Sequence, residues 1–109
     1  MSRSAETRLG ESWTRSPRMV GRRIGSEYVL VPLADRGADL DSILNLNTVA
    51  AFVWEQLDGA RSGSDVVAAV VERFEVERPR AERDYLELID TLVSVGAVHP
   101  AGRRARGRG

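Results

Sequence analysis

Three short segments in the first half of the chain carry the apolar pattern of β-strands. They are "MVGRRIG" at 19–25, "EYVLVPL" at 27–33 and "LDSILNL" at 40–46. The middle segment is dense in aromatic and β-branched residues, with Tyr28 and Leu30 alternating against their neighbours, which is typical of a half-buried strand. We therefore expect an antiparallel sheet of about three strands.

From Asn47 onward the apolar residues recur every three or four positions, which predicts helices. Asn47 is a good N-cap residue for the first helix. Its apolar stripe consists of Val49, Phe52, Val53 and Leu57. Asp58 and Gly59 are expected to end this helix through a left-handed Gly.

Two more helices follow from capping residues and apolar spacing. Ser62 and Asp65 resemble a capping box at the start of the second helix. Pro79 fits the first turn of the third helix, and Gly96 fits its C-terminal stop. The predicted buried stripe of the third helix consists of Tyr85, Leu88, Ile89 and Leu92. "AVHP" after it predicts a short extended segment.

The order of these elements predicts an α+β, winged-helix-like domain, in which a three-stranded antiparallel sheet is followed by three helices. We place this domain at residues 17–99. Residues 1–16 mix Ser, Thr, Arg and Glu with little periodicity, so they are expected to form a disordered N-terminal arm. Residues 100–109, "PAGRRARGRG", are expected to form a disordered Arg/Gly-rich tail.

The composition excludes several kinds of site. The chain has no Cys, so neither a disulfide nor a thiolate metal site is available. His99 is the single histidine, which is too few for a zinc site within one chain. No apolar run approaches the roughly 20 residues that span a bilayer, and the N-terminus lacks the apolar region of a signal peptide. We expect a soluble cytoplasmic protein with no membrane partner, metal or cofactor.

The polar residues do not suggest catalysis. An enzyme needs a convergent set of polar groups in a pocket. The acidic residues here lie at separated positions on predicted helix surfaces, where solvated faces and surface pairing explain them better than acid–base chemistry. No glycine-rich loop follows a strand in the phosphate-binding pattern. We therefore predict no catalytic residue and no enzymatic activity.

Nucleic-acid binding is an alternative that the winged-helix outline raises. Residues 17–99 hold nine Arg and 14 acidic residues, and their net charge of −5 would repel a phosphate backbone. The third helix, which would be the reader, has four acidic residues against two Arg in residues 79–96, a poor charge for recognition. The four Arg of the tail leave weak contact with nucleic acid open.

A free sheet edge points to a different function. The third strand, "DSILNL" at 41–46, has one charge and no Pro inside it, whereas natural proteins usually protect such edges. If this strand is the free edge, it can accept an extended peptide by strand addition, with backbone bonds for affinity and side-chain pockets for selectivity. The pattern leaves open whether the strand is free, covered or central.

The order and spacing of several residues resemble the PqqD-like family, whose domains are also called RiPP recognition elements, after ribosomally made, post-translationally modified peptides. The resemblance rests on Leu46-Asn47, Trp54, Leu57 and Asp58-Gly59, followed by "VVAAVVERFEV" at 66–76 and "DYLELIDTLVSVGAV" at 84–98. It extends from about Tyr28 to Val98, roughly two-thirds of the chain.

This resemblance implies a non-catalytic domain that captures the leader segment of a precursor peptide. The leader would add to the third strand, in a cleft closed by the third helix. Carried onto this sequence, the peptide-binding residues are Ser42, Ile43, Leu44 and Asn45 on the strand, and Arg83, Leu86, Glu87, Asp90 and Val93 on the helix. The motif residues Leu46, Asn47, Trp54 and Gly59 are assigned to the fold.

The expected function is therefore a binding module that presents a precursor peptide to a peptide-modifying enzyme. The resemblance implies a radical S-adenosylmethionine enzyme (radical SAM enzyme), a leader peptidase or a cyclodehydratase as that partner. A winged-helix nucleic-acid-binding protein is the first alternative, and a small adaptor with an unrelated protein ligand is the second.

Overall fold

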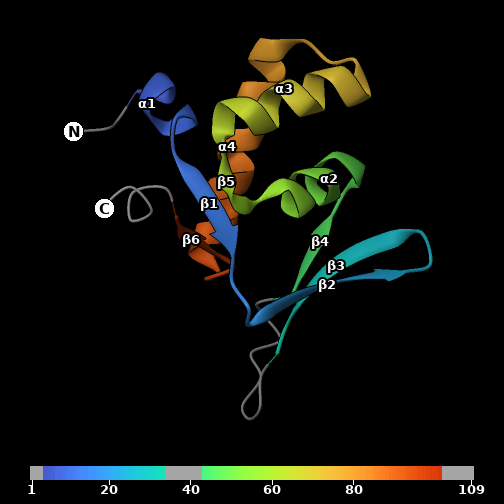
Figure 1. Cartoon of the computed structure of the whole chain (residues 1–109). Coiled ribbons are helices and arrows are strands. Elements are labelled where there is room, and N and C mark those ends of the chain that lie inside the picture. Colours follow the sequence, from blue (N-terminus) through green and yellow to red (C-terminus); the bar gives the residue numbers. More distant parts are fainter. Residues whose placement is uncertain (1–3, 34–42, 102–109) are drawn as a thin grey trace.

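The sheet expected in the first half of the chain is present in the computed structural model, which describes residues 4–33 and 43–101. Its strands are β2 (Met19–Ile24), β3 (Glu27–Pro32) and β4 (Leu44–Leu46), in the antiparallel order β2-β3-β4 (Figure 1). β4 is shorter than the expected strand at 40–46, of which residues 40–42 lie outside the described residues. The prediction of a three-stranded antiparallel sheet is confirmed.

Three helices follow this sheet, as expected. They are α2 (Thr48–Gln56), α3 (Gly63–Phe74) and α4 (Arg78–Ser94). Asn47 caps α2, its side-chain oxygen accepting a hydrogen bond of 2.8 Å from a backbone N–H one turn in. Ser62 and Asp65 form the predicted capping box of α3, and Pro79 lies in the first turn of α4. The predicted α+β fold class is confirmed.

A second three-stranded sheet, which the sequence pattern does not predict, joins distant parts of the chain. It consists of β1 (Ser12–Arg15), β5 (Asp58–Ser62) and β6 (Val98–Pro100), with β1 in the middle. Both pairings are antiparallel, so Thr14 lies opposite Asp58 on β5 and opposite His99 on β6. A short helix, α1 (Ala5–Leu9), precedes β1, and its Leu9 is buried.

The expectation of a disordered arm at residues 1–16 is therefore wrong for residues 5–15. This segment supplies the central strand of a sheet, and its helix packs on the core, so the folded part begins before residue 17. The predicted extended segment after α4 is present as β6. Pro100 and Ala101 belong to the fold, and the Ala101 N–H donates to the Ser12 carbonyl at 2.9 Å. The rest of the predicted tail, residues 102–109, and residues 1–3 lie outside the described residues.

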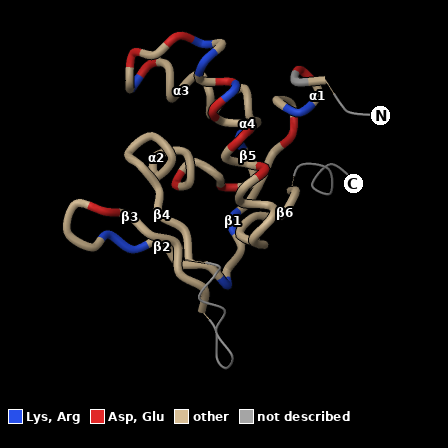
Figure 2. Tube along the Cα trace, turned by 180° about the vertical axis from the view of Figure 1, so that it is seen from behind, with Lys and Arg blue, Asp and Glu red and all other residues tan. Residues whose placement is uncertain are grey.

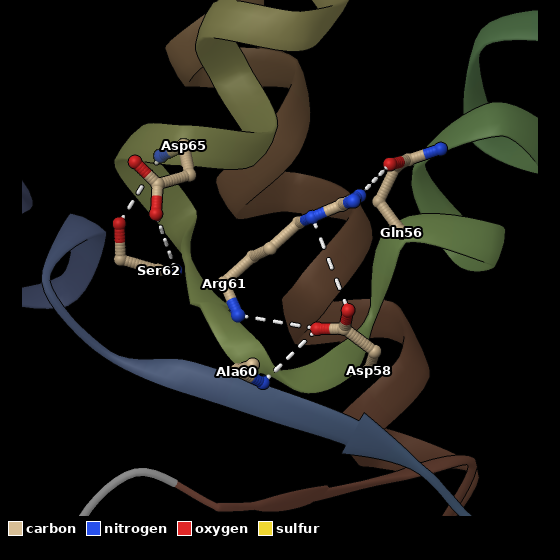
Figure 3. A network of polar contacts seen from close by, with 6 residues as sticks. All are labelled: Gln56, Asp58, Ala60, Arg61, Ser62 and Asp65. Atoms are coloured by element: carbon tan, nitrogen blue, oxygen red, sulfur yellow. Dashed lines mark hydrogen bonds and ion pairs between the residues drawn. The ribbon is translucent and has the colours of Figure 1, made fainter.

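The junction between α2 and α3 differs from the predicted helix stop. α2 ends at Gln56, and Asp58 and Gly59 begin β5 instead of capping the helix. Gly59 does take a left-handed backbone (φ +85°), but within a strand. The Asp58 carboxylate accepts hydrogen bonds from the backbone N–H groups of Ala60 and Arg61, and these bonds lower its pKa. The Arg61 guanidinium donates to the Gln56 side chain, which closes this turn (Figure 3).

The helices pack on one face of the β2-β3-β4 sheet, here called the inner face. Alternation along the strands places Met19, Leu30 and Leu46 on this face, and all three are buried. α2 covers them with Trp54, and α3 and α4 complete the core. Leu46 and Trp54 are thus core residues, as the sequence predicts. None of the helices in the described parts of the chain is long and apolar enough to cross a bilayer.

Candidate functional site

The described residues contain four sheet edges to which another strand could pair: β2, β4, β5 and β6. Three of them carry the features that natural proteins use to protect edges. β2 has two adjacent Arg, β5 has an Asp and an Arg, and β6 ends in Pro100. β4 and the residue before it, Ile43, carry no charge, Gly or Pro, and β4 is tan in Figure 2, the colour of uncharged residues. β4 is therefore the least protected of the four edges.

The strand residues predicted to bind peptide lie at this edge, apart from Ser42, which is outside the described residues. Ile43 is 42% exposed. Leu44 pairs with Leu30 and packs partly against the core, while Asn45 is exposed on the other face of the sheet. The edge therefore offers backbone groups together with two exposed side chains.

A groove of about 640 Å³ lies between α2 and α4, and we call it the α2–α4 groove. Much of its lining is apolar and buried or half-buried, with Val49, Ala50 and Val53 on α2 and Ala81, Tyr85 and Leu88 on α4. Its exposed polar lining includes Asp84, Glu87 and Thr91 on α4. Asn47, which follows β4 directly, also lines the groove, so the groove opens where β4 ends.

Of the five α4 residues predicted to bind peptide, Glu87 lines this groove and the other four do not. Asp90 faces α1, where its carboxylate accepts a hydrogen bond of 2.6 Å from the Arg8 guanidinium. Leu86 packs partly against the core, and Arg83 and Val93 are exposed. The sequence-based choice assumed that the ligand lies opposite the buried stripe of α4, but α1 contacts α4 on the side of Asp90.

The residues of α4 that line the groove but are not among the predicted peptide-binding residues are Asp84, Leu88 and Thr91. Each of them, and Glu87 as well, lies three or four positions from two others of the set, so the four residues share one flank of the helix. Leu88 was assigned to the buried stripe, yet it is only half-buried. An apolar residue at the border of a buried stripe is the signal that could have indicated this flank.

A second groove, of about 600 Å³, lies between the β2-β3 hairpin and α2. Aromatic rings and guanidinium groups line it. Arg73 stacks over Phe52 and Phe74 at 5.8 and 5.5 Å, and Arg23 lies 5.6 Å from the ring centre of Tyr28. Cation–π contacts of this kind contribute about 0.5–1 kcal/mol at exposed sites. The Arg73 contact with Phe52 joins α3 to α2, and the Tyr28 hydroxyl joins the hairpin to α2 by donating to the Glu55 carboxylate at 3.3 Å.

The β4 edge and the α2–α4 groove are suited to binding a ligand. The edge supplies backbone donors and acceptors, the α2–α4 groove supplies apolar surface, and its rim carries carboxylates. Asp84 is paired with Arg80 at 3.5 Å, so Glu87 is the acidic side chain of the rim with no ion pair to a neighbouring described residue. In the described residues no group of three or more His, Asp or Glu side chains could hold a metal ion.

The fold and the sequence both relate this chain to known proteins. One solved structure, "Lasso peptide synthetase B1 complexed with the leader peptide", has a TM-score of 0.66 and 27% identity, and the match covers 82% of this chain and 99% of that one. Another, "TbiB1 in Complex with the TbiA(beta) Leader Peptide", has a TM-score of 0.64 and 23% identity, with coverage of 79% and 94%. No curated protein matches the sequence.

The sequence also matches a protein family over a long, continuous range. Residues 27–98 match the family described as coenzyme PQQ synthesis protein D (PqqD). This range begins at β3, includes β4 and the three long helices, and ends at the first residue of β6. It covers well over half of the chain and contains both the β4 edge and the α2–α4 groove. The chain belongs to the PqqD family.

Proposed function

We propose that this chain is a non-catalytic binding module that captures the leader segment of a ribosomally made precursor peptide and presents it to a peptide-modifying enzyme. The observation that carries the proposal is the unprotected β4 edge beside the apolar α2–α4 groove. Membership of the PqqD family supports it, as do the two similar structures, each of which is a complex with a leader peptide.

The leader binds β4 by strand addition. β4 pairs with β3 in antiparallel register, with Asn45 opposite Val29. In such a ladder, alternate residues direct both their N–H and their C=O to the same side. Every second residue from Ile43 to Leu46 therefore offers both groups to an incoming strand, and each hydrogen bond contributes a net ~0.5–1.5 kcal/mol.

Selectivity comes from the α2–α4 groove. Successive side chains of an added strand point to opposite faces of the sheet. The leader side chains on the inner side of the sheet point into the groove beside the end of β4. There they contact the apolar lining formed by Val49, Ala50 and Leu88. The Glu87 carboxylate at the rim favours a leader with a basic residue beside its apolar one. The carboxylates of Asp84 and Glu87 at the rim repel a phosphate backbone, so the charge of the groove rim is unfavourable for the nucleic-acid alternative.

Proline substitutions test the edge. Leu44 and Asn45 are adjacent, so one of the two N–H groups points to β3 and the other to the free edge. Leu44→Pro and Asn45→Pro are each titrated with a fluorescent synthetic peptide of the proposed leader chemistry, an extended segment with a basic residue beside an apolar one. We expect the variant that lacks the outward N–H to lose leader binding while it stays folded, because proline has no donor.

Amide hydrogen exchange of the unsubstituted chain provides the second measurement of the edge. Addition of the leader should slow exchange of the outward amides of residues 43–46 and leave the edge of β2 unchanged. Protection of β2 instead of β4 would place the leader on the wrong strand for this proposal, and leader binding by both folded proline variants would exclude strand addition at β4.

A matched pair of α4 variants tests the groove. Thr91 is exposed and lines the groove, whereas Val93, two residues on, is exposed outside it. Thr91→Trp should fill the groove and weaken leader binding at least about tenfold, which corresponds to ~1.4 kcal/mol. Val93→Trp should bind like the unsubstituted chain. If Val93→Trp weakens leader binding and Thr91→Trp does not, the leader binds the α4 face expected from the sequence instead of the groove.

A further inference from the structure

The groove of about 600 Å³ between the β2-β3 hairpin and α2, here called the hairpin groove, lies on the inner face of the sheet (Figure 1). Strand pairing puts Arg23 opposite Tyr28, and Tyr28 opposite Leu46, and all three residues line this groove. Asn47, which precedes α2, lines both the hairpin groove and the α2–α4 groove. α2 therefore separates two grooves that both reach the end of β4.

Two arginines of the hairpin groove carry a positive charge without an ion pair. Arg73 lies near the end of α3 and Arg23 lies on β2, and both side chains are exposed. Neither forms an ion pair with any residue that the structure describes, whereas carboxylates pair with four other arginines, namely Arg8, Arg61, Arg78 and Arg80. An anion that enters the groove therefore meets two unpaired guanidinium groups.

Aromatic rings hold these guanidinium groups in place. The Arg73 guanidinium lies 5.8 and 5.5 Å from the ring centres of Phe52 and Phe74, and these two rings are in edge-to-face contact. The Arg23 guanidinium lies 5.6 Å from the ring centre of Tyr28. A guanidinium that contacts a ring through its face keeps the N–H donors at its edge available for a carboxylate. Because both groups are already positioned, less side-chain freedom is lost when an anion binds.

The other polar residues of the hairpin groove indicate which kind of anion it fits. Glu55 accepts a hydrogen bond from the Tyr28 hydroxyl, and Glu27 pairs with Ile24 on the outer side of the sheet. These two carboxylates favour a ligand with a single negative charge over a phosphate, which carries up to two. The hydroxyl and amide groups of the lining can donate to a carboxylate, and they belong to Ser26, Asn45, Asn47 and Thr48.

We propose that the hairpin groove binds an acidic residue of the precursor peptide, next to the segment that pairs with β4. This inference rests on the proposed function, because it places a second segment of the same peptide. Strand addition uses backbone bonds, which many sequences can form. A basic residue at the α2–α4 groove and an acidic residue at the hairpin groove match the charges of both, whereas the opposite arrangement is repelled at both. The order of charges thus selects one precursor among peptides that can all add a strand.

A double-mutant cycle between the chain and the peptide tests this site. The probe is the synthetic peptide with a basic residue beside an apolar one, extended at either end by a short flexible segment that carries one Glu. A matched probe has Gln in place of that Glu. The chain variant is Arg23→Gln/Arg73→Gln. The control is Arg22→Gln, at the next residue of β2, which pairs with Val29 on the outer face. Fluorescence anisotropy at low and high salt measures binding.

With one of the two extensions, the unsubstituted chain and Arg22→Gln should bind the Glu probe at least about threefold more tightly than the Gln probe, as expected for an exposed ion pair. High salt should reduce this difference. The double variant should bind both probes alike, and it should bind the unextended peptide as the unsubstituted chain does, which also shows that it is folded. Discrimination that persists in the double variant, or that is absent in the unsubstituted chain, would overturn the proposal.

NMR spectroscopy of the labelled full chain separates this site from the proposed function. The Nε–H signals of Arg23 and Arg73 are followed during titration with the blocked Glu extension alone, with its Gln counterpart and with inorganic phosphate. The Glu extension should shift both signals, and the Gln counterpart should not. Unchanged signals, or a larger shift with phosphate, would overturn the acidic-residue site. Failure of the unextended peptide to bind is measured separately and refutes the proposed function itself.

Discussion

Gly63 opens α3 at a point where the ring of Tyr85, on α4, closely approaches its backbone. A Cβ atom at Gly63 would lie 2.8 Å from a ring carbon of Tyr85. Tyr85 is 2% exposed, so the ring has no room to move away. Gly is therefore required here by close packing, although it is a poor helix former. The consequence is a phenol held largely out of water between two helices.

Burial raises the pKa of Tyr85 to about 12, with a smaller contribution from the charge of Glu11. The unfolded chain titrates near the ordinary value of about 10. Between these pH values the Tyr85 hydroxyl is deprotonated in the unfolded chain and protonated in the folded one. Its contribution to the free energy of unfolding is therefore fully present below pH 10 and is lost as the pH rises. We predict a loss of about 2 kcal/mol in the free energy of unfolding between pH 10 and 12.

Urea unfolding across this pH range measures the effect, and Tyr85→Phe should remove most of it. The chain is suited to the experiment because it contains no Lys or Cys and only two Tyr. The second, Tyr28, has a pKa raised by burial and by the neighbouring Glu55, and accounts for a small remaining slope. Equal slopes for both proteins would show that the buried phenol is not the source.

At the scale of elements, α1 is attached to the rest of the fold by two interactions of very different strength. Leu9 is 7% exposed and belongs to the core, whereas the Arg8–Asp90 ion pair has an Asp90 side chain that is 65% exposed. We predict that Leu9→Ala costs about 2–3 kcal/mol, because it leaves a cavity. Asp90→Ala should cost less than ~1 kcal/mol, since exposed pairs are screened by water and salt. Urea unfolding at low and high salt distinguishes them, and similar, salt-sensitive losses would reverse this ranking.

The elements that the sequence predicts well are those with local signals. Asn47, the Ser62–Asp65 capping box and Pro79 mark helix starts, and the predicted helices begin there. The strands β1 and β5 have no such signal, because "SWTR" and "DGARS" are short and do not alternate, and β6 was expected as an extended segment but without a pairing partner. They become strands because they pair across more than 40 positions of sequence. The groove face of α4 could not be recognised from the sequence for the same reason, since the position of α1 decides which flank of α4 stays open.

At the scale of the whole molecule, β1 joins three distant parts of the chain. It pairs with β5, which directly follows α2, and with β6, which follows α4. The two walls of the α2–α4 groove are thus tied to a strand that lies before residue 27, outside the range that matches the family. The geometry of the proposed site therefore depends on a segment that does not touch it.

Removal of residues 1–16 tests this dependence, because it deletes the central strand and leaves β5 and β6 without a partner. We expect the free energy of unfolding to fall by about 3 kcal/mol or more, from the lost burial of Leu9 and the lost ladder hydrogen bonds. Leader affinity should fall with it, as the groove walls loosen. Removal of residues 1–3, which leaves the α1 N-cap residue Ser4 and all of β1 in place, is the control. A truncated chain as stable as the full one would mean that β1 is dispensable, and would restore the interpretation of this segment as an arm.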